Sequence, residues 1–471
     1  MRAPNSLSCE APDGLPMPRR VGAILAVAFG VGLSVVDSTI ANVALPAIAR
    51  QLEIAPADSV WVVNAYQLAV MAAILPLSAL GGVWGYRRVY VCGLALFTAA
   101  SLGCALSASL PALVLSRVLQ GLGAAAVTSV NTTLIRFIYP RARLGRGMGI
   151  NATVVAVSSV AGPALSAAVL GVAEWPWLFA VNIPVGAVAL VLCCRYLPDN
   201  PVRAEGGFSW RDAGMSALTF GLLMASFEGF AHGADPLPVA CGAGAALLVG
   251  SRFVARELRA GNPVLPVDLL RIPIFAVSLL TSVCSYLAQM LAMVALPFYL
   301  QHSLGYDDVG AGLLLTAWPA VIMIAAPTAG YLVERVHAGA LGGTGLAAMA
   351  AGLFLLGTLP DDPSAGAIVW RLTLCGAGFA LFQSPNNSVL IASAPPARSG
   401  AASGMLATAR LAGQTLGAAI MALLFQLVPG GSTRAALLLA GAFALTGSAV
   451  SFARLRLPLP DALVGKRKIR K

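Results

Sequence analysis

Two ionisable residues stand inside long apolar stretches of this sequence, and together they could exchange a proton. Asp37 is the deepest acid of these stretches, and Arg117 enters a later one at a similar depth. A charge at membrane depth costs roughly 2.5–3.5 kcal/mol or more, so such residues are usually paired and functional. A nearby guanidinium favours the carboxylate, whereas poor solvation favours the neutral acid. The sequence therefore predicts a proton-coupling pair or, as the alternative, an ion pair that only fixes helix packing.

Small and polar residues share helix faces with this pair. At about 100° per residue, Asp37 lies on one face with Gly30 and Ser34, where another helix can approach closely. The face of Arg117 continues as a polar stripe made of Gln120, Gly121, Ala124, Thr128 and Asn131. We expect a substrate cavity lined by Ser34, Gln120, Thr128, Asn131, Asn151, Ser158, Asn386, Arg410 and Gln414.

The second half of the chain places arginines in its apolar runs without an acid at the same depth. Arg371 opens one run, and Arg410 lies on one face with Gln414, four residues further on. These arginines either bond helix carbonyls or face the cavity, and the sequence leaves both interpretations open.

Membrane-spanning helices are the elements that must hold these residues. The 471 residues are 58% hydrophobic and only 10% charged, whereas a soluble domain carries about 25% charged residues. Roughly fourteen apolar runs are each long enough to cross a hydrocarbon core as a helix. Continuous rather than alternating hydrophobicity favours helices over a β-barrel. The eight cysteines are scattered without metal-type spacing, so we expect no metal and no cofactor.

Basic residues predict the orientation of these spans. With the amino terminus inside, most of the 30 Lys and Arg residues fall on one side, and only Arg50 and Arg434 fall in loops on the other. This bias is typical of cytoplasmic loops, so we expect both termini in the cytoplasm. The net charge of +11 then belongs to a surface that faces the lipid bilayer, not to a nucleic-acid site.

The chain is expected to consist of two related bundles joined by a pair of helices. Val43–Pro46 and Val294–Pro297 share the letters VALP, and Arg117 and Arg371 each open a run; both pairs lie about 250 residues apart, as a duplicated bundle requires. The predicted parts are a cytoplasmic tail (1–19), a six-helix bundle (20–200), two linking transmembrane helices (201–258), a second six-helix bundle (259–456) and a basic cytoplasmic tail (457–471).

Several motifs carry a family resemblance across the whole chain. They are DSTIANVALP at 37–46, WVVNAYQL at 61–68, RVLQGLGAA at 117–125, Gly162-Pro163, and WPWLFAVNIPVG at 175–186. In these motifs the sequence resembles the fourteen-helix drug:proton antiporters of the major facilitator superfamily. The resemblance implies an all-α membrane fold of two pseudo-symmetric bundles.

The sequence departs from the family pattern in two places: in the loop at 78–88, near the expected cytoplasmic gate, and after Gly162-Pro163, where Ser166 and Ala167 stand in place of two glycines. The loop at 78–88 has Gly82 where an acid is expected, whereas Glu334 and Arg335 keep an acid–base pair in the second half. Gly162-Pro163 is a natural bending point, because proline removes a helix hydrogen bond. We expect a role in gating or close packing, and the alternative is a kink with no further role. Gating or structural roles are expected for Gly85, Arg87, Arg88, Gly121, Gly162, Pro163, Gly330, Glu334, Arg335 and Arg371.

The expected function is secondary active export of small, largely apolar compounds, driven by protons. The chain has no phosphate-cradling Gly-rich motif and no His-Glu-x-x-His, so we do not expect an enzyme. A permease for one metabolite or antibiotic, working as a uniporter or symporter, is the alternative. The abundance of arginine over lysine and the many alanines suggest a bacterial inner membrane. The expected partners are a small-molecule substrate, protons and the bilayer, with a possible monomer.

Overall fold

Helices are the only regular secondary structure in the residues that the computed structural model describes, namely 14–54, 56–59, 61–200, 208–231, 235–258, 267–306, 308–360, 363–395, 398–428 and 432–457. Both predicted tails fall largely outside these residues, as do 201–207 and 259–266 at the expected domain boundaries. The first half comprises α1 (Arg19–Gln51), α2 (Pro56–Ser59), α3 (Trp61–Trp84), α4 (Tyr86–Ala105), α5 (Leu110–Ile138), α6 (Leu144–Leu170), α7 (Pro176–Ala180) and α8 (Asn182–Tyr196).

The remaining helices form a hairpin and a second half. The hairpin is α9 (Trp210–Ala231) and α10 (Pro236–Glu257). The second half comprises α11 (Pro273–Phe298), α12 (Asp308–Leu315), α13 (Ala317–Leu332), α14 (Ala338–Gly357), α15 (Ala365–Ser393), α16 (Ser399–Leu427) and α17 (Ser432–Ala453).

Twelve segments in the described residues are long and apolar enough to cross a membrane. The chain is therefore a multi-pass membrane protein. Neither α9 nor α16 is among the twelve, so the expected fourteen spans stay a prediction. Both are nevertheless long helices, of 22 and 29 residues, and α16 packs against α11, α3 and α5.

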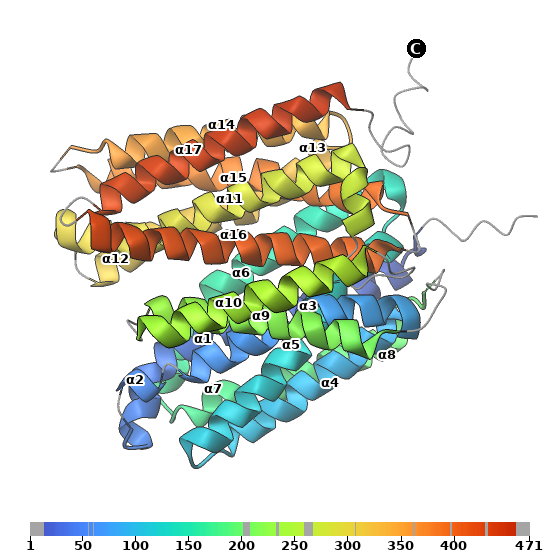
Figure 1. Ribbon diagram of the computed structural model, residues 1–471, viewed down its shortest axis with the longest axis horizontal. Coiled ribbons are helices and arrows are strands. Elements are labelled where there is room, and N and C mark those ends of the chain that lie inside the picture. The colour runs from blue at the N-terminus through green and yellow to red at the C-terminus, as the bar shows by residue number, and fades with distance from the viewer. Residues whose placement is uncertain are drawn as a thin grey trace, which may run out of the picture.

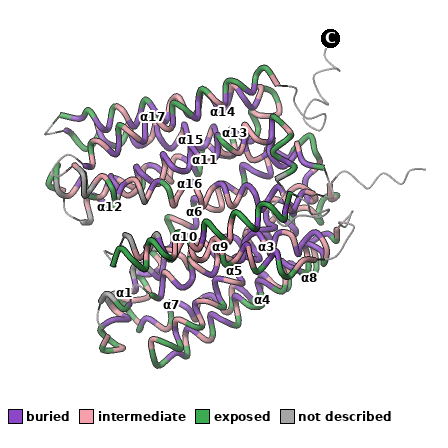
Figure 2. Tube along the Cα trace, in the orientation of Figure 1, coloured by how far each residue is buried: buried purple, intermediate pink, exposed green. Residues whose placement is uncertain are grey.

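The two halves lie side by side and meet through matching helices (Figure 1). The main contacts between them pair α6 with α13 and α3 with α16. The α9–α10 hairpin packs on α3 and lies across the front of the molecule in Figure 1. Much of α10 is exposed in Figure 2, as expected for a helix whose surface faces lipid. The hairpin therefore adds to the pair of bundles and joins their core through one small cluster, in which Phe253 of α10 packs with Ile74 and Leu75 of α3.

A close helix contact recurs at equivalent positions and supports the predicted duplication. In the first half, a Cβ atom on Gly123 of α5 would lie 2.6 Å from the carbonyl oxygen of Gly93 in α4. In the second half, a Cβ atom on Gly345 of α14 would lie 2.6 Å from the carbonyl oxygen of Gly378 in α15. Gly93 in the first half corresponds to Gly345 in the second, and Gly123 corresponds to Gly378. Corresponding residues are about 250 positions apart in the sequence, which is the spacing of the sequence repeat. Only glycine allows two helix backbones to approach this closely.

We expect Gly123→Ala to destabilise the first half, because the added methyl group would overlap the backbone of α4. Overpacking of this kind costs roughly 1–3 kcal/mol, and unfolding of the detergent-solubilised protein would measure it. Gly244→Ala is the matched control, since nothing lies within 4 Å of the Cβ position at Gly244 in α10. Equal stability of the two variants would contradict the close contact.

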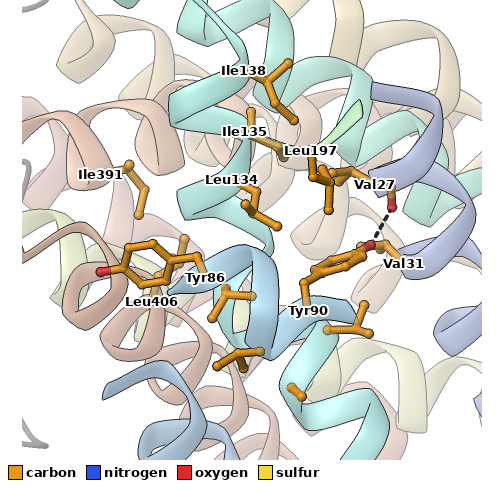
Figure 3. Close-up of a cluster of buried hydrophobic side chains, with 14 of the residues drawn as sticks. Val27, Val31, Tyr86, Tyr90, Leu134, Ile135, Ile138, Leu197, Ile391 and Leu406 are labelled. Carbon is orange, nitrogen blue, oxygen red and sulfur yellow. Dashed lines mark hydrogen bonds between the residues drawn. The ribbon is translucent and has the colours of Figure 1, made fainter. Parts of the chain in front are cut away.

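The halves are joined at the end of the molecule that carries Arg87, Arg136 and Arg146, called here the arginine-rich end. Figure 3 shows an apolar cluster in which Ile391 and Leu406 of the second half lie beside Tyr86 and Leu134 of the first. Polar contacts add to it: Arg136 Nη1 donates to the carbonyl oxygen of Ile391 at 2.7 Å and to Ser399 Oγ at 2.7 Å. This end is therefore closed, and the opposite end is the one that carries α2 and α12.

Candidate functional site

Asp37 and Arg117 form an ion pair in the interior of the first half. Arg117 Nη1 lies 2.6 Å from Asp37 Oδ2, and both side chains are fully buried at 0% exposure. Asp37 is on α1 and Arg117 on α5, so the contact joins two helices that are adjacent in space. The predicted pairing of these residues by depth is thus present in the structure. In such a place each charge depends on the other, because neither can reach water.

Three amide and hydroxyl side chains complete the surroundings of the carboxylate. Asp37 Oδ1 accepts from Gln120 Nε2 at 2.8 Å and from Asn182 Nδ2 at 2.7 Å. Gln120 Nε2 also donates to Ser101 Oγ at 2.8 Å. Both carboxylate oxygens therefore accept hydrogen bonds, from donors on α5 and α8.

Arg117 is held by a carbonyl and two aromatic rings besides the carboxylate. Its Nε donates to the carbonyl oxygen of Val62 at 2.8 Å, and its Nη1 donates to Gln120 Oε1 at 2.6 Å. The guanidinium carbon lies 4.3 Å from the ring centre of Tyr66 and 5.6 Å from that of Phe179. Nη2 is buried and has no hydrogen-bond partner in the described residues. The pair thus connects α1, α3, α5 and α8 and leaves one donor free to respond to a change at Asp37.

The polar residues expected along the first half's cavity divide into two groups. Asn131 Nδ2 donates to Asn151 Oδ1 at 2.9 Å and joins α5 to α6; the Oδ1 atom of Asn131 is buried without a partner. Ser34 and Thr128 instead bond carbonyls of their own helices, Gly30 at 3.0 Å and Ala124 at 2.8 Å. Ser158 is buried beside the Cα of Gly32. Asn131 Oδ1 is thus a buried acceptor that has no hydrogen-bond partner within the described part of the chain.

Two of the second-half candidates form hydrogen bonds within the fold. This agrees with one of the two interpretations left open for Arg371 and corrects the cavity role expected for Asn386. Arg371 Nη1 donates to the carbonyl oxygen of Ala367 one turn earlier, at 2.6 Å, so the carbonyl-bonding interpretation holds for it. Asn386, expected in the cavity, is fully buried between helices and accepts from Arg454 Nη1 at 2.6 Å. Arg454 is one of the basic residues that the charge bias places on the cytoplasmic side, near the basic tail, but it is only 1% exposed. It is buried because oxygens of Asn386, Ser278 and Ser451 surround its guanidinium.

Arg410 and Gln414 have a different environment from Arg371. Arg410 is partly buried on α16, and its Nε is buried with no hydrogen-bond partner in the described residues. Gln414, on the next turn, is also partly buried.

The predicted gating residues lie at the arginine-rich end and at close helix contacts. Gly85 has φ +113°, a backbone conformation that favours glycine. Arg87 pairs with Asp199 at 3.2 Å, while Arg88 is exposed. Arg335 donates to the Tyr331 hydroxyl of its own half.

The glycines of the gating motifs pack helices together. A Cβ atom on Gly121 would lie 2.6 Å from the carbonyl oxygen of Tyr66 in α3. At Gly162 it would collide with Thr39 of α1, and at Gly330 with the carbonyl oxygen of Gly145 in α6. Pro163 lies in α6, where its side chain falls outside the described part of the chain. Close packing, the structural interpretation of these motifs, accounts for all three glycines.

Glu334, expected to form an acid–base pair with Arg335 in the second half, instead links the two halves. Its Oε1 lies 3.0 Å from Arg146 Nε, and its Oε2 accepts from Arg146 Nη2 at 3.1 Å. The partner is therefore Arg146 of α6, not the adjacent Arg335. The pair closes the arginine-rich end beside the contact of Gly145 with Gly330.

We expect Glu334→Gln to let the arginine-rich end open more often. A partly exposed ion pair contributes at most about 1 kcal/mol, so the opening equilibrium should change by up to about fivefold. The readout is alkylation of Ser403→Cys in a cysteine-free background, because Ser403 is 2% exposed at this junction. Asp268→Asn is the matched control, since Asp268 pairs with Arg398 within one half, at 3.0 Å. Unchanged alkylation in Glu334→Gln relative to this control would contradict the role of the pair.

Sequence reasoning missed Tyr66, Ser101 and Asn182 as members of the site. Tyr66 belongs to a group of aromatic residues near the outer ends of apolar runs, where the sequence favours a place at the membrane interface, yet it is only 6% exposed and lies against Arg117. Trp175, Tyr299 and Trp318 of the same group are buried too, whereas Trp61 and Trp177 are exposed. Asn182 is part of the motif at 175–186, but the motif assigns it no role. The signal was present in its position at the start of an apolar run, but its partner depends on how α8 packs on α1.

The fold is that of a membrane transporter whose two halves lie side by side. A model of the Major Facilitator Superfamily matches residues 27–275 and 278–471, and the chain belongs to that superfamily. It is 54% identical over 447 residues to the uncharacterized transporter YebQ of Escherichia coli, with 95% of this chain and 98% of YebQ covered.

More distant relatives are named for different transport functions. The riboflavin transporter RibZ of Clostridioides difficile is 30% identical, with 85% of this chain and 87% of RibZ covered. The multidrug resistance protein Stp of Mycobacterium tuberculosis is 31% identical, with 84% of this chain and 74% of Stp covered. Among solved structures, the proton:xylose symporter XylE has a TM-score of 0.67 at 15% identity, with 95% of this chain and 98% of XylE covered. The structural likeness shows the fold alone.

Proposed function

We propose that this chain is a proton-coupled exporter of small hydrophobic or amphiphilic compounds, working by alternating access. The observation that carries the proposal is the fully buried Asp37–Arg117 pair, with the carboxylate reached by donors from two helices. Among relatives, Stp is named for multidrug resistance. Fourteen spans, cytoplasmic termini, a bacterial inner membrane and a monomeric protein complete the proposal.

The coupling step is protonation of Asp37. Neutralising the carboxylate removes the counter-charge of Arg117, whose Nη2 already lacks a partner. It also changes the hydrogen bonds at Asp37, because a protonated oxygen needs an acceptor where Gln120 and Asn182 now present donors. Contacts among α1, α5 and α8 then weaken together, and the first half can move relative to the second. Loss of the proton restores the contacts seen here.

The direction of transport follows from which end opens. The arginine-rich end, which we assign to the cytoplasm, is closed by Arg136, Glu334 and the apolar cluster of Figure 3. Asp37 is buried in the state seen here, so proton uptake from the outside requires a local opening around α1 that exposes the carboxylate. The substrate leaves on the same side. After protonation the closed end opens and admits substrate from the cytoplasm. Inward proton movement through this cycle drives export.

A permease for one metabolite is the second candidate. It is favoured by the relative RibZ, which is named as a riboflavin transporter. Such a protein would recognise a narrow set of polar groups and would not need Asp37 to titrate.

Everted membrane vesicles distinguish these functions. Respiration acidifies the vesicle interior, and addition of a transported compound should then release protons from it if the protein exchanges the two. Release by chemically diverse members of a broad drug panel supports the proposal. Absence of release across the panel, with uptake of a single metabolite that does not depend on pH, would favour the permease.

A further inference from the structure

We propose that Arg410 binds an anionic oxygen group of the transported compound, so that the substrates include organic anions. The inference rests on the proposed export function and adds the chemical class of its substrate. It starts from the charges of the molecular interior. Asp37 and Arg117 cancel each other, whereas Arg410 has no ion pair, no hydrogen bond and no ring contact among the described residues.

The position of Arg410 excludes a simple surface role. It lies eleven residues after Ser399 in the 29-residue helix α16, so its guanidinium is far from both helix ends. At about 1.5 Å per residue, it is roughly 16 Å from the start of the helix. A lone cation at such depth is unfavourable by roughly 2.5–3.5 kcal/mol or more. A bound anion would offset this cost in the loaded transporter.

The face of α16 that carries Arg410 is turned toward the junction of the halves. Ser403 and Gly417, each seven residues away, lie within roughly 20° of Arg410 around the helix. Ser403 Oγ donates to the carbonyl oxygen of Ser129 in α5 at 2.7 Å, across the junction. A Cβ atom on Gly417 would lie 2.6 Å from the carbonyl oxygen of Leu287 in α11. Arg410 therefore points between α5 and α11.

The lipid-facing side of α16 lies elsewhere. Leu416 and Leu423, at 48% and 45% exposure, are rotated from Arg410 by roughly 120–140°. Arg410 nevertheless remains partly exposed, although its Nε is buried. Arg410 thus combines a buried Nε with accessible side-chain atoms, on a helix face other than the one that carries Leu416 and Leu423.

The chemistry of the ligand follows from the guanidinium and its neighbours. A planar arginine fork matches the two oxygens of a carboxylate. Gln414, one turn further along the same face, offers an amide, while Leu406 and Ala407 before it are apolar. The expected ligand is an apolar body with one carboxylate or similar oxyanion. Export of such an anion is also favoured by an inside-negative membrane potential, by about 2.3 kcal/mol per charge per 100 mV.

A pair of isosteric probes tests the assignment on the purified full-length transporter in detergent. Binding of 1-naphthoate and of 1-naphthamide, which share one aromatic body, is measured by calorimetry at neutral pH. A hydrogen-bonded ion contributes about 1.5–3 kcal/mol, so the wild type should bind the anion at least about tenfold more tightly. Arg410→Gln should remove this preference, and Arg410→Lys should keep part of it. Arg371→Gln, the matched control, should leave it unchanged, because Arg371 bonds a carbonyl of its own helix.

Failure of this inference is separable from failure of the export function. Asp37→Asn should lose transport driven by a pH gradient but keep the preference for naphthoate. The assignment is overturned if the wild type does not prefer naphthoate, including the case in which it binds neither probe. It is equally overturned if Arg410→Gln, monodisperse in gel filtration, discriminates as the wild type does.

Discussion

Replacing Asp37 with asparagine should abolish substrate gradients driven by pH while leaving the protein folded. Asparagine keeps the shape of the side chain and can still accept from Gln120 or Asn182, but it cannot bind a proton. A pH difference of one unit provides about 1.36 kcal/mol per proton, which supports about a tenfold substrate gradient at one-to-one exchange. The variant should lose all of that gradient. Downhill movement of the same compound should continue.

Proteoliposomes with an imposed pH difference measure this effect directly. Asp199→Asn is the matched control, because Asp199 is also paired with an arginine but is 81% exposed. It should accumulate substrate as the wild type does. If Asp37→Asn builds the same gradient as this control, the buried pair has only the structural role that the sequence left as an alternative.

Replacing Arg117 with methionine should produce the largest loss of stability of any single change at the site. The substitution leaves the Asp37 carboxylate buried without its counter-charge, which costs about 3–5 kcal/mol. It also removes the donors to the carbonyl of Val62 and to Gln120 Oε1. Equilibrium unfolding in mild detergent gives the free energy of unfolding, and gel filtration gives the fraction that remains monodisperse.

The double variant Asp37→Asn/Arg117→Met separates the charge from the packing. Removing both charges should recover much of the lost stability, since no uncompensated ion remains. Arg87→Met supplies the control for an exposed pair, whose loss costs no more than about 1 kcal/mol. The interpretation is wrong if Arg117→Met is as stable as Arg87→Met, or if the double variant is no more stable than the single one.

The centre of the site could be predicted from the sequence because its physical cause is local. Asp37 and Arg117 are charges within apolar runs, and such charges need partners at the same depth. The structure brings them to 2.6 Å. The duplication was likewise visible in spacing, and the matching contacts of Gly123 with Gly93 and of Gly345 with Gly378 agree with it.

The rest of the site depends on helix packing that no single run encodes. Asn182 reaches Asp37 only because α8 lies against α1, and Tyr66 reaches Arg117 only because α3 lies against α5. Arg454 is the clearest failure. Its place near the basic tail suggests a surface charge, but Arg454 follows directly after α17, and its guanidinium donates to buried oxygens of Ser278 in α11 and Asn386 in α15.

Infrared difference spectroscopy of the carboxyl group at residue 37 tests the central claim most directly. Spectra of the purified transporter, recorded through a pH titration with and without a transported compound, are compared with those of Asp37→Asn. The proposed mechanism predicts a protonated carboxyl band that appears as the pH falls, shifts when substrate is added and is missing in the variant. A titration identical in the two proteins would show that Asp37 keeps one protonation state, which contradicts proton coupling through this residue.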